Sequence, residues 1–263
     1  MSQLLQVKNI IRGEKGILNS PILEETYLSK ISSLHESHSF LGKSTQAVYV
    51  RQTQFIATFL KALPNQDLAS YKVLDWGCGK GQITYLLKKE GLNITSCDLQ
   101  VESEDSSFGQ EIPIIKEQKI DVIPLTDNVH LPFPSESFDC VLSFGVLEHV
   151  KQDLSSMQEV RRILKKDGLF IITFLPYKLS WTQALAHLRG NFYHDRLYWR
   201  SDIKQMAENS GFEIASIEMA QLFPKNSIPL KLDRILEKLD RLLCAYTPLK
   251  FFATNLEVIL IAK

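Results

Sequence analysis

The chain has 263 residues, of which 44% are hydrophobic and 23% charged, so it is long enough to bury the core of one α/β domain with additions. Its 30 basic residues balance its 30 acidic ones, which excludes a global field that would draw the protein onto nucleic acid or anionic lipid and leaves only a local patch open. The N-terminus lacks the apolar core of a signal peptide, and no window approaches about 18 consecutive apolar residues, so we expect a soluble cytoplasmic protein.

The cysteines show no C-x-x-C pair and no histidine at the spacing of a zinc site. Scattered thiols in a chain of this length indicate a reducing compartment, and free cysteine packs as a small hydrophobic residue. We therefore expect core or turn positions for all of them: Cys78, Cys97, Cys140 and Cys244.

The N-terminal part, residues 1–66, is expected to form a helical cap that precedes the main domain, residues 67–263. One helix is predicted over 44–63, where apolar residues recur at helical spacing, and Pro64 should end it. The apolar stripe consists of Val48, Phe55, Ile56, Phe59 and Leu60.

From about residue 70, short apolar runs alternate with amphipathic segments, a pattern typical of strands and helices that build a mostly parallel sheet. The predicted fold class is α/β and Rossmann-like. A helix is expected over 153–168, with Gly168 as its C-terminal stop, and a further helix and strand within 201–220. The other strands are expected at 71–76, 93–99, 119–124, 138–145, 168–175 and 255–262.

Residues 176–200 and 221–254 do not fit this alternation. Insertions at loop positions of an α/β scaffold often build the substrate pocket, so we expect these two segments to form a substrate cap.

The stretch "VLDWGCGKG", residues 73–81, places Gly77, Gly79 and Gly81 between a buried strand and a helix. Glycine permits dihedrals that are closed to other residues and lets a ligand approach the bare backbone. Asp98 ends the next strand, where an acid in such folds accepts hydrogen bonds from ribose hydroxyls. The sequence therefore predicts a ribose-containing cofactor.

The glycine spacing distinguishes between two kinds of cofactor. A dinucleotide site has the pattern G-x-G-x-x-G, but the sixth position here is Gln82 and the third glycine comes one residue earlier. A nicotinamide oxidoreductase is therefore the second choice.

The motif "VLDWGCGKG" resembles the first motif of class I S-adenosylmethionine-dependent methyltransferases, and 126–150, "TDNVHLPFPSESFDCVLSFGVLEHV", resembles their next two signatures. The likeness is to the broad bacterial branch that methylates small molecules and covers about 70–220. It implies S-adenosylmethionine as the cofactor and a seven-stranded sheet ending in an antiparallel hairpin.

The resemblance also implies roles for single residues. The first motif would lie against the methionine moiety, Asp98 would bind the ribose, Asp127 would contact the adenine amino group, and Asn128 would present backbone to the ring. Asp75 could instead cap its turn, and Asp127 could form an Asx turn. The expected cofactor-binding set is Asp75, Gly77, Cys78, Gly79, Gly81, Asp98, Leu99, Asp127, Asn128 and Phe144.

Methyl transfer from a sulfonium depends mainly on alignment of the acceptor atom, and a base is needed only where the nucleophile must lose a proton. His149, just after the fourth predicted strand, is the candidate base. The alternative is that "LEHV" marks the strand exit and His149 bonds locally.

The ubiquinone-biosynthesis O-methyltransferases carry E-x-x-E-H here and hold a metal ion with the two glutamates and the histidine. This chain has Gly145 where the first glutamate would stand. Because a hard cation would lose a charged ligand, we predict no bound metal at Glu148 and His149.

The aromatic segment before residue 201 resembles the family's acceptor-side stretch, and His194, Arg196 and Tyr198 are the candidate substrate residues. Trp199 is more readily explained as packing against the core. Arg51, in the N-terminal helix, is a candidate for the carboxylate of the cofactor.

Residues 226–246 predict one strong amphipathic helix, or two broken near Pro229. Packing of its apolar face over the domain is the simpler explanation, and contact with a lipid-linked acceptor or a membrane surface is the other. The predicted function is methyl transfer to a small-molecule or glycan- or lipid-linked acceptor, with oxygen as the favoured atom. A regulatory module that binds S-adenosylmethionine without turnover remains an alternative. The N/D-P-P-Y signature of nucleic-acid amino-methylases does not follow the fourth strand, so no nucleic-acid partner is expected.

Overall fold

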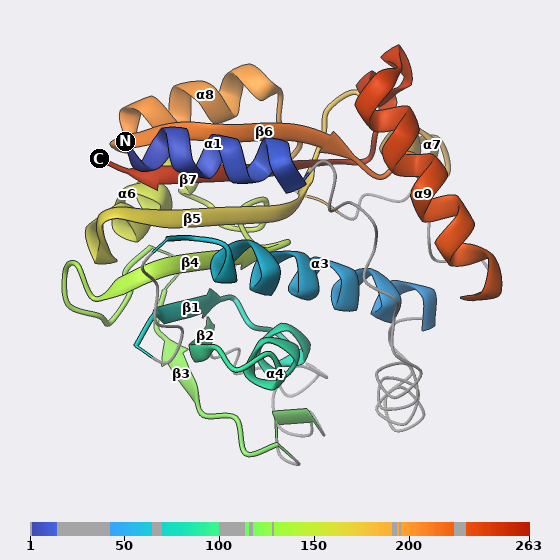
Figure 1. Ribbon diagram of the computed structural model, residues 1–263. Helices are drawn as coiled ribbons and strands as arrows, with labels where there is room; N and C mark the ends of the chain where they lie inside the picture. Colours follow the sequence, from blue (N-terminus) through green and yellow to red (C-terminus); the bar gives the residue numbers. More distant parts are fainter. Residues whose placement is uncertain are drawn as a thin grey trace.

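The computed structural model describes residues 2–14, 43–64, 70–99, 114–115, 118–127, 129–190, 194, 196–223 and 230–263. Its centre is a seven-stranded sheet in the order β3-β2-β1-β4-β5-β7-β6 (Figure 1). The strands are β1 (Lys72–Trp76), β2 (Asn93–Leu99), β3 (Val122–Leu125), β4 (Phe138–Phe144), β5 (Leu164–Pro176), β6 (Phe212–Ala220) and β7 (Asn255–Ala262).

The first five strands pair in parallel, and β7 lies antiparallel between β5 and β6. The predicted α/β class, the seven strands and the terminal antiparallel hairpin are all confirmed. Parallel strands carry their carboxyl ends to one edge, so the loops after β1, β2 and β4 meet there.

Two helical layers cover the sheet (Figure 1). Alternate strand residues face opposite layers: Val73 packs with the first layer and Leu74 with the second. The first layer consists of α1 (Gln3–Glu14), α3 (Lys43–Lys61) and α4 (Gln82–Lys89). The second contains α6 (Asp153–Ile163) and α8 (Arg200–Asn209).

The N-terminal helices share their core with the sheet. Val7 of α1 and Ile56, Phe59 and Leu60 of α3 belong to the same buried cluster as Leu142 of β4. The helix predicted over 44–63 is confirmed as α3, with its apolar stripe facing the sheet. The division of the chain at residue 66 remains a prediction.

One predicted helix ends earlier than expected. The pattern over 153–168 gave a helix stopped by Gly168, but α6 ends at Ile163 and β5 begins at Leu164. Leu164 is fully buried and pairs with Phe138, so sheet pairing overrides the helical preference of the following lysines. Gly168 lies inside the strand, where a Cβ would come within 2.9 Å of the Lys165 carbonyl oxygen.

Three further helices lie toward the carboxyl edge of the sheet: α7 (Trp181–Leu188), α9 (Leu230–Tyr246) and the 3-10 helix η2 (Pro248–Phe252). Figure 1 shows α7 and α9 at the end of the sheet where β5 and β6 finish. These helices belong to the two segments predicted as insertions. Among the described residues, none of the helices is both long and apolar enough to cross a bilayer.

Candidate active site

The glycine turn after β1 is built from three residues with positive φ: Gly77 at 72°, Gly79 at 51° and Gly81 at 77°. Only one of them faces open space. A Cβ on Gly77 would lie 2.5 Å from a methyl carbon of Val146, and one on Gly81 would lie 2.9 Å from Ile115. A Cβ on Gly79 would meet nothing within 4 Å among the described atoms, so the room for a ligand lies beside Gly79.

Asp98 lies at the end of β2 and faces this turn. Its Oδ2 accepts a short hydrogen bond from the Gly79 N–H, and its Oδ1 accepts one from the Leu99 N–H at 2.7 Å. Burial raises the pKa of Asp98, and the two N–H donors oppose the shift. Each carboxylate oxygen keeps acceptor capacity, which suits the ribose hydroxyls expected there. Leu99 is exposed beside it.

Asp75 lies beneath the turn rather than on its surface. It is buried, and its Oδ2 accepts a hydrogen bond from the Thr84 hydroxyl at 2.6 Å, which ties β1 to α4. Burial raises the pKa of Asp75 to about 7. Its Oδ1 is buried with no hydrogen-bond partner among the described residues, so an acceptor remains for a cationic or N–H group that reaches the turn. The Cys78 thiol is buried as well, and its pKa is raised by that burial.

Asp127 forms the Asx turn that was the alternative to adenine contact. Its Oδ1 accepts hydrogen bonds from the N–H groups of Val129 and His130, both at 2.7 Å. These bonds hold the pKa of Asp127 below its ordinary value. Asn128 lies outside the described residues.

Three aromatic rings pack together at the carboxyl ends of β4 and β5. The Phe144 ring centroid lies 6.0 Å from that of Phe174, and Tyr49 of α3 meets Phe174 edge-on at 5.5 Å. Phe174 has a φ of 59° at a register shift in β5, a conformation that non-glycine residues adopt at a cost and that often marks functional sites. No sequence pattern pointed to Phe174 or Tyr49.

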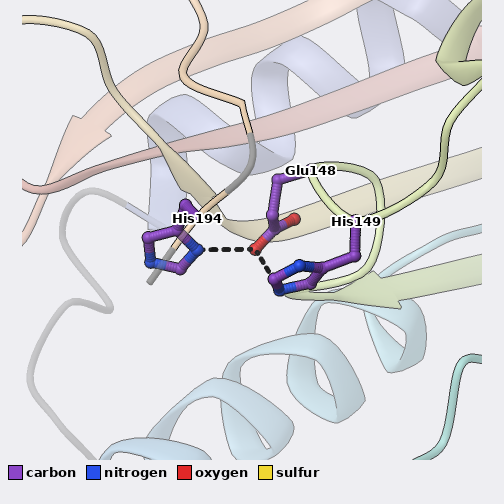
Figure 2. Close-up of side chains that lie close together, drawn as sticks. All are labelled: Glu148, His149 and His194. Carbon is purple, nitrogen blue, oxygen red and sulfur yellow. Dashed lines mark ion pairs between the residues drawn. The ribbon is translucent and has the colours of Figure 1, made fainter. Parts of the chain in front are cut away.

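The loop after β4 carries a buried carboxyl group between two imidazoles (Figure 2). Glu148 Oε1 lies 3.9 Å from His149 Nε2 and 3.8 Å from His194 Nδ1. The Glu148 side chain is 2% exposed, that of His194 26% and that of His149 48%. His149 therefore faces outward from the cluster, and a substrate can reach it.

Burial raises the pKa of Glu148 to about 7. Its Oε2 is buried with no hydrogen-bond partner among the described residues. The Glu148 carboxyl group can therefore take up or release a proton near neutral pH.

His194 reaches this cluster because the residues after it are fastened to the same loop. Arg196 donates to the carbonyls of Val150 and Lys151 at 3.2 and 3.1 Å and forms an ion pair with Asp153 at 2.6 Å. Tyr198 is buried, and its hydroxyl donates to the Leu147 carbonyl at 3.1 Å.

Of the three predicted substrate residues, His194 alone lies at the cluster. The polar groups of Arg196 and Tyr198 bond to the loop after β4, and these contacts hold the segment that follows His194 against that loop. Trp199 packs against the core and meets Tyr177 edge-on, in line with the packing role expected for it.

Arg51 is buried and forms an ion pair with Glu237 of α9 at 3.3 Å. The guanidinium that was a candidate for the cofactor's carboxylate thus meets a carboxylate of the chain itself.

The same cluster contains potential metal ligands. One ligand atom from each of Glu148, His149 and His194 lies within 4.8 Å of the others. The prediction of no metal considered Glu148 and His149 alone, and the structure adds His194 as a third donor. Gly145 has a φ of 67°, and a Cβ there would lie 3.5 Å from Glu148 Oε1, so a glutamate at this position would place a second carboxylate beside the first.

Three comparisons bear on the family. Residues 74–172 match the family model described as a methyltransferase domain. An uncharacterized methyltransferase of Bacillus subtilis, YodH, is 36% identical over 174 residues, which are 65% of this chain and 70% of that protein. The ubiquinone biosynthesis O-methyltransferase of Rickettsia bellii (strain OSU 85-389) is 25% identical over 166 residues, covering 58% of this chain and 65% of that protein.

Among solved structures, a SAM-dependent methyltransferase from Archaeoglobus fulgidus superposes with a TM-score of 0.50 at 19% identity, over 80% of this chain and 94% of that one. This likeness supports the fold. The open side of Gly79, the acid at the end of β2 and the Asp75 oxygen that lacks a partner among the described residues fit a cationic nucleoside. The chain belongs to the class I S-adenosylmethionine-dependent methyltransferases, and S-adenosylmethionine is its cofactor.

Proposed function

We propose that this methyltransferase acts on a hydroxyl oxygen of a small-molecule or a glycan- or lipid-linked acceptor, and that His149 accepts the hydroxyl proton. The single observation that carries the proposal is the buried Glu148 carboxyl between the imidazoles of His149 and His194, at the carboxyl end of β4. In class I folds this edge of the sheet faces the ligand crevice.

The cofactor would bind at the turn after β1. Asp98 and the open side of Gly79 would hold the ribose and the adjacent chain, with Leu99 and Phe144 along the adenosyl group. Asp127 would in addition contact the adenine amino group. When bound, S-adenosylmethionine supplies an electrophilic methyl group.

The acceptor side depends on proton chemistry. A hydroxyl must lose its proton as its oxygen attacks, whereas a neutral amine needs no base. His149 is half exposed and can receive that proton, and Glu148 and His194 lie where they can hold its ring and share the charge. The name of the Rickettsia relative, an O-methyltransferase, agrees with oxygen as the target atom.

The loop that carries His149 and the cofactor turn after β1 are in direct contact. Val146, two residues before Glu148, fills the space over Gly77. The base loop and the cofactor turn are therefore packed against each other, and this rigidity favours the alignment on which methyl transfer depends.

The experiment is transfer of a labelled methyl group to matched panels of hydroxyl and amine acceptors. We expect turnover on hydroxyls, and we expect His149→Gln to lower kcat by about 10² to 10⁴ with unchanged affinity for S-adenosylhomocysteine. His187→Gln, on α7, is the matched control and should behave as the wild type. Equal rates for the wild type and His149→Gln would remove His149 as the base.

Calorimetry with S-adenosylhomocysteine tests the cofactor half separately. Asp98→Ala should weaken binding by about tenfold or more, since a group that accepts from the ribose is lost. Binding without turnover on any acceptor would instead favour the regulatory module.

A further inference from the structure

The α9 helix packs with its charged side toward the protein. Glu237 and Asp240 are buried. Glu237 forms ion pairs with Arg51 at 3.3 Å and with Arg241 at 2.7 Å. Asp240 Oδ1 accepts hydrogen bonds from the N–H groups of Leu222 and Phe223 at 2.7 and 2.8 Å. Polar contacts therefore fix the orientation of this helix.

The opposite side of α9 is apolar and faces outward. Its residues follow one another at intervals of three and four, so they form a single stripe along the helix. Ile235 is 66% exposed and Tyr246 80% exposed. The full stripe consists of Leu232, Ile235, Leu239, Leu242 and Tyr246. The helix does pack over the domain, as the simpler explanation of 226–246 expects, but it does so through its charged side and the half-buried Leu236 and Leu243, while most of the apolar stripe is exposed.

The 3-10 helix η2, which contacts α9, and the helix α7 also carry exposed apolar side chains. In η2, Leu249, Phe251 and Phe252 are exposed, and in α7 Trp181, Leu185 and Leu188 are exposed. The Trp181 indole donates to the carbonyl of Leu222, the residue whose N–H bonds to Asp240, so α7 and α9 flank one segment. Apart from Leu5 and Leu99, the exposed large apolar side chains of the described chain all lie on α7, α9, η2 and the turn before α7. We call this the outer apolar surface.

Over 177–190 and 235–252, where the side chains are described, the charges that reach solvent are basic. Within 177–190 and 235–252 the acidic residues are Glu237 and Asp240, and both are buried. The basic residues there reach solvent in whole or in part: Lys178, Arg189, Lys238, Arg241 and Lys250. An apolar stripe with basic flanks is the pattern of a helix that lies in the headgroup region of an anionic membrane.

We propose that the outer apolar surface docks the protein on an anionic lipid membrane, with α9 lying in the plane of the interface. A second copy of the chain is a poorer occupant, because a symmetric contact would bring like basic residues together with no exposed acid in these segments to pair with them. Trp181 and Tyr246 have the amphipathic rings that are enriched at membrane interfaces.

The docked orientation has a consequence for the acceptor. Pro176 ends β5 directly before α7, at the same sheet edge where Glu148 and His149 follow β4. A docked protein would present its cluster close to the headgroups. The docking does not depend on the proposed function, whereas the choice of a lipid-linked acceptor rests on it.

The test is co-sedimentation of the full chain with vesicles of phosphatidylcholine containing about 30% phosphatidylglycerol, and with pure phosphatidylcholine vesicles as the neutral comparison. We expect binding to the anionic vesicles in about 50 mM salt and much weaker binding in about 500 mM salt. No binding to anionic vesicles at the lower salt concentration would overturn the proposal.

Variants separate the surface from the rest of the molecule. Leu239→Ser/Leu242→Ser should reduce vesicle binding by about tenfold, and Lys238→Glu/Lys250→Glu by a similar factor. The matched controls are Leu5→Ser and Lys204→Glu, which lie outside the surface and should bind as the wild type. Equal losses in the surface and control variants would contradict the proposal.

Binding of S-adenosylhomocysteine by each variant shows that it is folded and keeps the cofactor site. If the wild type binds S-adenosylhomocysteine but no anionic vesicles, the docking proposal is wrong and the proposed function still stands. A dimer in solution that the Leu239→Ser/Leu242→Ser variant converts to a monomer, without vesicle binding by the wild type, would show that a second copy covers the surface.

Discussion

The side chain of Val146 occupies the space that a Cβ on Gly77 would need, with its methyl carbons 2.5 and 2.9 Å from that position. Gly77 belongs to the cofactor turn and Val146 to the loop that carries Glu148 and His149. The absence of a side chain at Gly77 therefore allows these two loops to touch, and the glycine serves the packing of the protein itself.

Gly77→Ala should lower the free energy of unfolding by about 2 to 5 kcal/mol, because left-handed strain adds to overpacking against Val146. Gly79→Ala should cost only the strain, about 1 to 2 kcal/mol, but should weaken cofactor binding by about tenfold, because its Cβ enters open space. Urea unfolding and calorimetry with S-adenosylhomocysteine measure both. Adding Val146→Ala to Gly77→Ala should recover part of the loss, and strict additivity of the two changes would argue against the contact.

Asp75 should make the protein less stable as the pH rises. Burial raises its pKa from 3.8 to about 7, so the folded state binds the proton more tightly than the unfolded state. Its contribution is complete below the ordinary pKa and is lost as the pH rises through about 7, a change on the order of 4 kcal/mol.

Asp75→Asn removes this titration and keeps an acceptor for Thr84. Denaturant unfolding at about pH 5 and about pH 8 should show a smaller decline for the variant than for the wild type. Because the pKa of Glu148 is also raised to about 7, some decline should remain. Identical declines in both proteins would contradict the assignment.

The cluster of Glu148, His149 and His194 should work without a metal ion if His149 is the base. Two imidazoles and one carboxylate suit a borderline ion such as Zn²⁺ better than Mg²⁺. Added Zn²⁺ should then inhibit, because it takes the nitrogen lone pair that would receive the proton, and chelation with EDTA should leave the rate unchanged.

Methyl transfer after dialysis against EDTA, with and without added Zn²⁺, measures this. His194→Gln removes one ligand and should raise the Zn²⁺ concentration needed for inhibition by about tenfold. If chelation abolishes activity and one equivalent of a divalent ion restores it, a metal ion rather than His149 activates the acceptor.

The Arg51–Glu237 pair should matter for stability rather than for the cofactor. Glu237→Leu removes this carboxylate from the buried Arg51 and should cost about 3 to 5 kcal/mol, whereas in Arg51→Met the Glu237 carboxylate keeps its ion pair with Arg241 and the cost should be smaller. The double variant Arg51→Met/Glu237→Leu should cost less than Glu237→Leu alone, because it also removes the buried guanidinium. A strong loss of S-adenosylhomocysteine affinity in Arg51→Met, without loss of stability, would instead indicate that Arg51 binds the carboxylate of the cofactor.

The sequence was sufficient for the scaffold. Strand β2 lies where the alternation of 93–99 predicted it, and the antiparallel position of β7 follows from the family resemblance. The end of α6 was wrong by about five residues, because the helical preference of Lys165 and Lys166 yields to sheet pairing that no local pattern shows.

The glycines and Asp98 were found by spacing, since a turn and its acid are separated by one strand unit along the chain. Spacing did not reveal why each position must be glycine. The side chains that leave no room for a Cβ, Val146 at Gly77 and Ile115 at Gly81, come from distant parts of the chain. Asp127 had two interpretations in the sequence, and its hydrogen bonds to the next residues make the Asx turn a feature of the structure.

The sequence alone determined the strands and the glycine turn, because local hydrophobic period and turn chemistry specify them, and the resemblance of its motifs indicated the family. Tertiary structure decided that His194 joins Glu148, since Arg196 and Tyr198 fasten a segment to a loop about 45 residues away in the chain. It also decided which side of α9 faces outward. Helical periodicity is the same for either orientation, and only the partners of Glu237 and Asp240 place the charged side within the protein.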